Sequence, residues 1–199
     1  MASAADQPLL AELFADADPL VREISLRGLQ NIGGEKAVSE LIRLLGDPSP
    51  NVRAAVLKLL EEKSIPGMSL AVADYVKNEK DPDLVVHAIR VLKTGGGSSA
   101  VKSLTALLSH PVWQVRAEAA EALGKSSSIT TKDRSEVYVA MIQLLDDSDS
   151  FVVSRAAQAL SGAETDIVVE PLAKAAEKHP DLTATIVEIL SSNDSLRTK

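Results

Sequence analysis

Six leucines recur along the chain and divide it into similar segments. Each follows another aliphatic residue by eight positions and a small or apolar residue by four. Residues at these spacings lie along one side of a helix. The pattern predicts six equivalent amphipathic helices with buried leucines, the last less buried because its segment is terminal. The leucines stand 30 to 37 residues apart and are Leu29, Leu60, Leu92, Leu123, Leu160 and Leu190.

A second amphipathic run precedes each of these helices. Examples are AVSELIRLL and AVKSLTALL, and short polar turns such as GDPSPN and SHP follow them. Asp, Ser or His before Pro is typical of a helix start, because the short side chain caps free amides and proline fits the first turn. Each segment is therefore predicted to contain helix A, a tight turn and helix B. Self-similarity at a period of 20–50 residues indicates a stacked-repeat protein.

Glycines mark the predicted linkers. Gly67, Gly95 to Gly97 and Gly124 follow predicted helices, where glycine can adopt the left-handed conformation that closes a helix. The longest linker is predicted at 125–135, as an insertion on one edge of the stack. We expect an N-terminal extension at 1–7, a single repeat domain at 8–191 and a flexible tail at 192–199. The repeats are predicted near 8–32, 35–63, 67–94, 98–125, 134–162 and 165–191.

The repeated phrase resembles the HEAT-repeat family, in particular the short HEAT-like form found in phycobilin lyases and many bacterial proteins. The resemblance rests on a leucine-rich helix, then Asp-Pro, then Val-Arg, then Ala-x-x-Ala-Leu. LIRLLGDPSPNVRAAVLKLL carries it around Asp47 and Arg53, and LLSHPVWQVRAEAAEAL around Arg116. It covers roughly residues 8–191. The fold that it implies is an all-α, right-handed α-solenoid of six HEAT-like helix-turn-helix repeats, with the B helices on the concave side.

Three arginines occupy the same position in helix B. We expect Arg22, Arg53 and Arg116 each to reach an acidic or carbonyl group at a neighbouring turn between helices, with Asp16 and Asp47 as the best partners. These contacts would be structural. Other residues hold the position in the remaining repeats and should interrupt such a ladder: Val85, Val153 and Thr183.

Catalytic, metal and cofactor sites are not predicted. The chain contains no cysteine, which excludes thiolate catalysis, disulfides and cysteine-bound metals. Its histidines, His87, His110 and His179, form no His-x-x-x-His or His-Glu spacing. HEAT-like hydroxylases that bind iron carry repeated His-Glu pairs, which argues against that activity. His110 and His179 precede prolines, where we expect helix capping or exposure.

The net charge and the hydropathy of the chain limit the kinds of partner that it is expected to bind. The net charge of −7 works against binding to nucleic acid or an anionic membrane. HEAT-like alkylpurine glycosylases need a basic groove with aromatic residues, whereas this chain is acidic and has one tryptophan. No apolar run approaches a membrane span, and the first residues lack the pattern of a secretory signal. The expected location is cytoplasmic.

One column of B-helix positions is a candidate binding surface. It lies two residues before each leucine and is basic over the first three repeats and neutral or acidic over the last three. The column is either an ordinary solvated face or a polarised groove for an extended or helical peptide. Trp113 is either packed over a turn or exposed as an anchor. The column contains Arg27, Lys58, Arg90, Glu121, Gln158 and Glu188, with Lys93 adding positive and Glu118 adding negative charge.

The predicted function is that of a noncatalytic scaffold or adaptor, free-standing or part of a longer chain, that binds a protein or peptide along the concave helix-B face. The alternative, which the resemblance implies, is a phycobilin-lyase-like subunit or chaperone that handles a tetrapyrrole and its acceptor protein. The partner-binding candidates are Arg27, Lys58, Arg90, Lys93, Glu118, Glu121 and Glu188.

Overall fold

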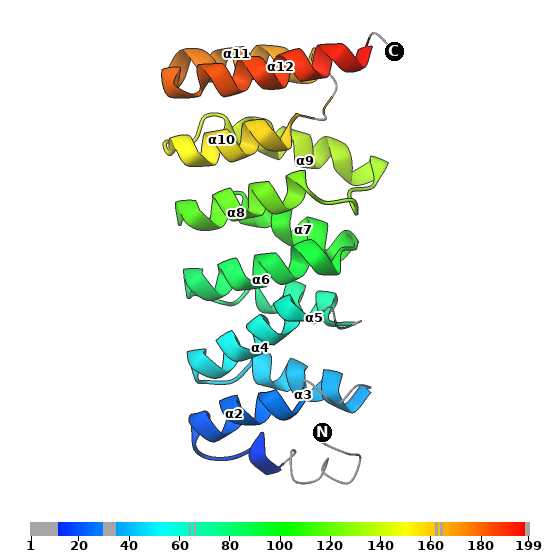
Figure 1. The fold of residues 1–199 in the computed structure, drawn as a ribbon, viewed down its shortest axis with the longest axis vertical. Coiled ribbons are helices and arrows are strands. Elements are labelled where there is room, and N and C mark those ends of the chain that lie inside the picture. The colour runs from blue at the N-terminus through cyan, green and yellow to red at the C-terminus, as the bar shows by residue number, and fades with distance from the viewer. Residues whose placement is uncertain are drawn as a thin grey trace. The chain divides into compact units, whose positions relative to one another are not determined.

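The structure is a computed structural model that describes residues 12–29, 35–63, 65, 67–161, 163 and 165–197. Within these ranges the regular elements are all helices. The chain divides between Gly95 and Gly96 into two compact units, each built from stacked helices (Figure 1). The predicted all-α fold is confirmed. The helix expected at the start of the first repeat falls mainly outside the described residues.

The first unit has two layers, one of B helices and one of A helices. In the B layer α4 packs against both α2 and α6, and in the A layer α3 contacts α5 (Figure 1). The B helices are α2 (Pro19–Leu29), α4 (Pro50–Glu62) and α6 (Pro82–Gly95). The A helices are α3 (Glu35–Leu45) and α5 (Met68–Tyr75).

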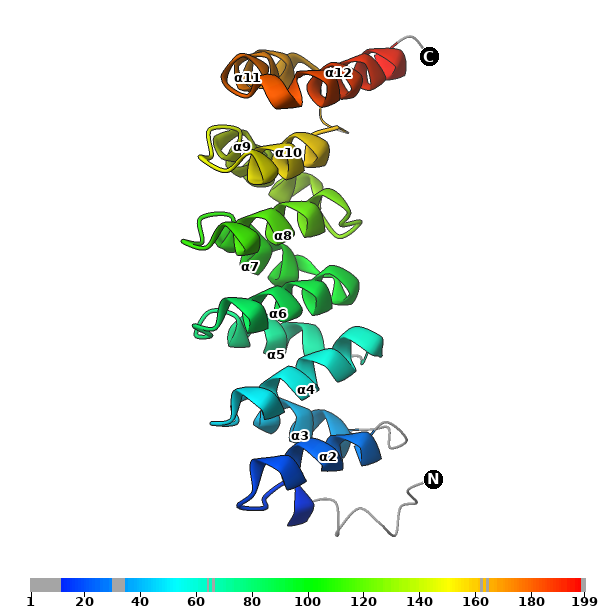
Figure 2. The same ribbon diagram turned by 60° about the vertical axis from the view of Figure 1, so that its left-hand side comes forward.

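The second unit repeats this arrangement. Helix α10 packs against α8 and α12 in the B layer, and α7 contacts α9 in the A layer (Figure 2). The B helices are α8 (Trp113–Gly124), α10 (Ser150–Ala159) and α12 (Thr183–Arg197), the last preceded by the 3-10 helix η2 (Pro180–Leu182). The A helices are α7 (Ser98–Leu107), α9 (Thr131–Leu144) and α11 (Thr165–Lys178).

The recurring leucines form the core of the B layer. Leu60, Leu92, Leu123 and Leu160 are at most 2% exposed, as predicted. Leu190 is only partly buried, in line with its place in the terminal repeat. The side chain of Leu29 lies outside the described residues. The i, i+4, i+8 pattern therefore located the buried stripe correctly.

The linker glycines have two different roles. Gly67, Gly96 and Gly97 have positive φ angles of 86°, 63° and 89°, as expected for residues between helices. Gly95 was predicted to adopt the left-handed conformation as well, but it is the last residue of α6 and has no positive φ. Gly124 was also predicted to close a helix in this way, and that prediction is wrong. It is the last residue of α8, and a Cβ atom there would lie only 2.7 Å from Cβ of Ala159 in α10. Gly124 therefore permits the close approach of two B helices.

The predicted long linker is shorter than expected. Helix α9 begins at Thr131, so residues 131–135 form its first turn. The hydroxyl oxygen of Thr130 accepts a hydrogen bond from the amide of Asp133 and donates one to its carboxylate. This reciprocal cap starts the helix earlier than the polar composition suggested. The loop is confined to residues 125–130.

The arginines at the shared B-helix position brace the turn that precedes their own helix. In each case Nη1 donates to a backbone carbonyl six residues earlier. The distances are 2.8 Å from Arg22 to Asp16, 2.9 Å from Arg53 to Asp47 and 2.8 Å from Arg116 to His110. Each Nη1 also reaches the carbonyl of the next residue in the turn.

The other two nitrogens of each guanidinium reach a carboxylate in the next repeat. Arg22 holds Asp47 at 2.8 and 2.7 Å, and Arg116 holds Asp147 at 2.7 and 2.8 Å. Arg53 holds Glu79 at 2.9 and 3.3 Å. The predicted contacts of the three arginines are confirmed. Such two-pronged pairs are strong and geometrically specific, so they tie consecutive repeats together.

The turn position that holds the carboxylate partner of the arginine also stabilises its own turn. In five consecutive repeats the residue at this position accepts a hydrogen bond, 2.8–3.1 Å long, from the backbone amide two residues later. These turns are therefore built alike, even where no arginine reaches them from the preceding repeat. Asp16, Asp47, Glu79, His110 and Asp147 are the acceptors, and His110 uses Nδ1. His110 was expected to cap a helix or be exposed, and this is wrong: it is partly buried and closes the turn before α8, whose N-cap is Val112.

Truncation of a core leucine tests the buried stripe. We predict that Leu92→Ala lowers the free energy of unfolding by about 2–5 kcal/mol, because it leaves a cavity between packed helices. The matched control is Leu20→Ala, since Leu20 is 57% exposed and its loss should change stability by less than about 0.5 kcal/mol. Urea denaturation measures both. Equal effects of the two substitutions would contradict the assigned register.

The Glu79 carboxylate should make stability depend on pH. Burial acts to raise its pKa, but hydrogen bonds from the Tyr75 hydroxyl, the Asp81 amide and Arg53 outweigh burial and lower the pKa from 4.5 to about 2. A carboxyl group whose pKa is lower in the folded state contributes stability above its ordinary pKa. That contribution is lost as the pH falls through the window from 4.5 to about 2.

Comparison of the wild type with Glu79→Gln isolates this effect. We predict that the wild type is more stable by about 2 kcal/mol at pH 7, and that roughly half of this difference is gone at pH 3. Urea denaturation at pH 7, 5, 4 and 3 gives the difference at each pH. A difference that stays constant over this range would show that Glu79 does not carry the stabilising charge.

Candidate functional site

The predicted cations of the first unit lie on the B layer. Arg27 and Lys58 are exposed on α2 and α4. On α6 the Arg90 side chain is 43% exposed and lies 3.7 Å from Glu61, while Lys93 is partly buried. The structure thus places Arg27, Lys58 and Arg90 on three consecutive B helices of one compact unit.

Carboxylates that lie outside the predicted column of B-helix positions are found among these cations. Glu23 and Glu62 line a crevice of about 200 Å³ between α2 and α4, together with Arg27 and Lys58. The sequence could have indicated these neighbours. Glu23 and Arg27 are four residues apart, as are Lys58 and Glu62, and residues at this spacing share a helix face. The surface is therefore a row of cations flanked by carboxylates.

In the second unit the predicted acidic positions are partly neutralised. Glu121 on α8 lies 2.6 Å from Lys125 and 3.2 Å from Arg155 of α10. Glu118 is partly buried, whereas Gln158 and Glu188 are exposed. Arg155 does not belong to the predicted column. It lies close to Glu121 because α10 packs against α8.

An aromatic pair is exposed on the same two helices. Trp113 is 40% and Phe151 is 49% exposed, and their ring centroids are 5.9 Å apart in an edge-to-face arrangement. The guanidinium of Arg155 lies 4.8 Å from the centre of the Phe151 ring. Of the two alternatives for Trp113, the structure favours the exposed one, with a contact to Phe151 that the sequence did not indicate.

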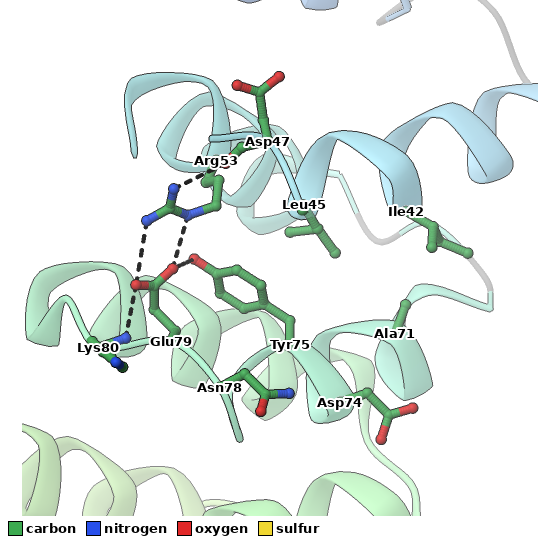
Figure 3. Close-up of a pocket in the computed structure, with 11 residues that line it drawn as sticks. Ile42, Leu45, Asp47, Arg53, Ala71, Asp74, Tyr75, Asn78, Glu79 and Lys80 are labelled. Atoms are coloured by element: carbon green, nitrogen blue, oxygen red, sulfur yellow. Dashed lines mark hydrogen bonds and ion pairs between the residues drawn. The ribbon is translucent and has the colours of Figure 1, made fainter. Parts of the chain in front are cut away.

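A larger cavity of about 690 Å³ opens between α3, α5 and the turns that follow them. Figure 3 shows Ile42 and Ala71 at one end and the hydrogen-bonded side chains of Arg53, Glu79 and Tyr75 at the other. The lining also includes Asp74, which forms an ion pair with Lys77. Arg53 and Glu79 at one end and Asp74 at the other are thus engaged in local ion pairs.

The titratable groups at the polar end of this cavity are unsuited to proton transfer near neutral pH. Burial and the Glu79 hydrogen bond raise the pKa of the Tyr75 phenol above its usual value, so it stays protonated. Glu79, with a pKa of about 2, stays ionised. A general acid or base works best when its pKa is near the working pH. This cluster therefore supports the turn and offers no acid–base pair.

The histidines are structural as well. Nδ1 of His87 lies 3.0 Å from the Glu61 carboxylate. His179 was expected to cap a helix or be exposed, and this is wrong: it is 9% exposed, and its Nδ1 lies 3.3 Å from the Ser150 hydroxyl. The 3-10 helix η2 follows it directly, so the imidazole sits against α10 at the short turn before α12.

Two further findings concern other kinds of site. Among the described residues, no group of three or more His, Cys, Asp or Glu side chains could hold a metal ion. Across the same ranges, none of the helices combines the length and apolar character needed to cross a membrane.

Comparisons with known proteins agree with this architecture. The crystal structures of two engineered proteins are similar, each at 21% sequence identity. One matches with a TM-score of 0.62 over 95% of this chain and 94% of its own, and the other with 0.65 over the full length of both. A search of curated proteins found no match. The family model for HEAT repeats matches residues 7–67 and 69–161. The chain therefore belongs to the HEAT-repeat family.

Proposed function

We propose that this chain is a noncatalytic scaffold or adaptor of the cytoplasm that binds a protein or peptide partner along its B-helix surface. The proposed contacts are Arg27, Lys58, Arg90 and Lys93 in the first unit, and Glu118, Glu121 and Glu188 in the second. The rival role in handling a tetrapyrrole rests on the type of repeat alone.

Helix packing supports the choice of the B surface. In the first unit α4 packs against α2 and α6 more extensively than α3 packs against α5. In the second unit α8 packs against α10 more extensively than α7 against α9. Helices that approach more closely form the inner side of a curved layer, and repeat proteins commonly bind along such a surface.

The observation that carries the proposal is the row of Arg27, Lys58 and Arg90. The core does not require their charges, since Arg27 and Lys58 are exposed and the Arg90 side chain is 43% exposed. The same unit does bury charge where its fold needs it, at Arg22 and Arg53. Arg27 and Lys58 at equivalent exposed positions, with Arg90 beside Glu61 on the next B helix, suit an acidic stretch of a partner, which they would steer and orient.

A charge-altering variant tests this proposal. The variant combines Arg27→Glu, Lys58→Glu and Arg90→Gln, where Gln avoids placing a second carboxylate beside Glu61. The matched control has the same change in net charge on exposed A-helix residues: Lys102→Glu, Lys132→Glu and Arg134→Gln. Affinity capture from the source organism identifies the partner of the wild type, and calorimetry then gives its affinity for all three proteins at two salt concentrations.

We expect the B-surface variant to bind the captured partner about tenfold more weakly at low salt, with a smaller dependence on salt, because a rim charge acts through screened Coulomb attraction. The control should bind like the wild type. Each substitution should change stability by less than about 0.5 kcal/mol. Equal affinities and equal salt dependence for the wild type and the B-surface variant would refute the proposed site.

A further inference from the structure

A further cavity lies in the second unit, at the loop that joins α8 to α9. It has a volume of about 340 Å³ and is lined by the C-terminal ends of α8 and α10, by loop residues between 126 and 129, and by one side of α9. This volume is in the range of small-molecule sites. None of the partner-binding candidates on the B helices lines this cavity.

One side of α9 supplies a wall of the cavity. Arg134, Val137, Tyr138 and Met141 all line it, and residues three, four and seven positions apart share a helix face. Val137 and Met141 are buried and form an apolar floor, whereas Arg134 is exposed. Arg134 belongs to this face because α9 already begins at Thr131, in a segment expected to be a loop.

The cavity offers polar groups that are not engaged elsewhere. Arg134 is the only charged residue among the described residues that line it, and within the described part of the chain its guanidinium makes no hydrogen bond or ion pair. This distinguishes it from the arginines that brace the turns. The hydroxyl groups of Ser127, Tyr138 and Ser161 also line the cavity and have no partner in the same ranges.

The charges around the cavity leave one positive charge in excess. The segments 121–141 and 155–161 carry four cations and three carboxylates: Lys125, Lys132, Arg134 and Arg155 against Glu121, Asp133 and Glu136. Glu121 forms ion pairs with both Lys125 and Arg155, and the Asp133 carboxylate accepts the Thr130 hydroxyl at 2.7 Å. Lys132 and Glu136 stand two positions from Arg134, so they do not share its helix face.

The helix ends at the cavity oppose an anion only weakly. The negative partial charge of a helix C-terminus resides on carbonyl groups that lack a hydrogen bond. The carbonyls of Glu121 and Leu123 in α8, and those of Gln158 and Leu160 at the end of α10, each accept a hydrogen bond from an amide that follows the helix. The full charge of Arg134 therefore dominates the electrostatics of the cavity.

We propose that this cavity binds a small organic monocarboxylate with an apolar body. The carboxylate accepts two hydrogen bonds from the Arg134 guanidinium, a geometry for which arginine is well suited. The apolar body lies against Val137 and Met141, and the unpartnered hydroxyls bind polar substituents of the ligand. A phosphate monoester carries a charge of about −1.5 to −2 near neutral pH, which one guanidinium does not balance.

This site goes beyond the proposed binding of a protein partner and does not depend on it. Titration of the isotope-labelled full chain with hexanoate, followed by the amide chemical shifts in nuclear magnetic resonance, measures the affinity and the location together. Hexanol, hexylamine and hexyl phosphate are the matched ligands, because they keep a short alkyl body and change only the charge and shape of the head group.

Two variants and one control locate the contacts. Arg134→Gln removes the charge and Tyr138→Phe removes one hydroxyl. The matched control is Lys132→Gln, since Lys132 is exposed in the first turn of the same helix but does not line the cavity. Circular dichroism confirms that each variant is folded, which we expect for Arg134→Gln because this side chain is exposed and unpaired.

We expect hexanoate to bind the wild type at least about tenfold more tightly than hexanol or hexylamine, with shifts centred on residues 123–141 and 159–161. Arg134→Gln should weaken hexanoate binding about tenfold, Tyr138→Phe about twofold, and Lys132→Gln less than about twofold. Added salt should weaken binding to the wild type, because the attraction is between charges.

The two proposals can fail separately. The B-surface variant of Arg27, Lys58 and Arg90 should lose the protein partner and keep hexanoate. The A-helix variant that contains Arg134→Gln should keep the protein partner and lose hexanoate. A failure of partner binding therefore leaves this site standing, and a failure of hexanoate binding leaves the proposed function standing.

Several results would overturn the inference. These are an absence of shifts at about 10 mM hexanoate, shifts centred away from the lining residues, equal binding of hexylamine, or equal binding to the wild type and to Arg134→Gln. Equal losses in Arg134→Gln and Lys132→Gln would show a general effect of charge and refute the site. Tighter binding of hexyl phosphate than of hexanoate would refute the assignment to a monocarboxylate.

Discussion

The bridge between an arginine of one repeat and a carboxylate at the next turn is the interaction on which the stack depends. It joins Arg22 to Asp47 and Arg53 to Glu79 in the first unit, and Arg116 to Asp147 in the second. Each arginine also binds the carbonyls of its own turn, so a single side chain fixes both the angle between helices A and B and the position of the next repeat. Helices held in this way bring their leucines into contact. Where a glycine such as Gly124 replaces a larger residue, two B helices approach still more closely.

The same bridge separates structural charge from charge that remains accessible. The carboxylates of Asp47, Glu79 and Asp147 are largely buried and hydrogen-bonded, so they are not available to a ligand. The more exposed groups of the B helices are Arg27, Lys58 and Arg90 in the first unit, of which Arg90 lies beside Glu61, and the rings of Trp113 and Phe151 in the second.

The sequence predicted the fold well because the buried stripe follows directly from helical geometry. In an α-helix, a leucine eight residues after an aliphatic residue lies on the same face as that residue. The ends of the helices were predicted less well, because local caps decide where a helix begins. The hydrogen bonds between Thr130 and Asp133 extend α9 into a segment whose composition suggested a loop. The role of Gly124 also escaped prediction, since only the approach of α10 shows that a side chain would not fit there.

The candidate site was predicted less completely, because its contacts join separate repeats. Arg22, Arg53 and Arg116 could be foreseen from their shared position, but Glu79 could not be singled out as the partner of Arg53, since a glutamate stands there in place of the aspartate of other turns. The contact of Trp113 with Phe151 spans 38 residues, and no periodic signal marks it. His179 departs from the capping expectation because its turn is built by a 3-10 helix.

A double-mutant cycle on Arg116 and Asp147 tests the central claim most directly. Urea denaturation at pH 7 would give the free energies of unfolding of the wild type, Arg116→Met, Asp147→Asn and the double variant. If the bridge holds neighbouring repeats together, the two single substitutions are not additive, and the coupling energy is about 1–3 kcal/mol. Additive effects, with a coupling energy near zero, would show that leucine packing alone sets the stack and that the bridge is incidental.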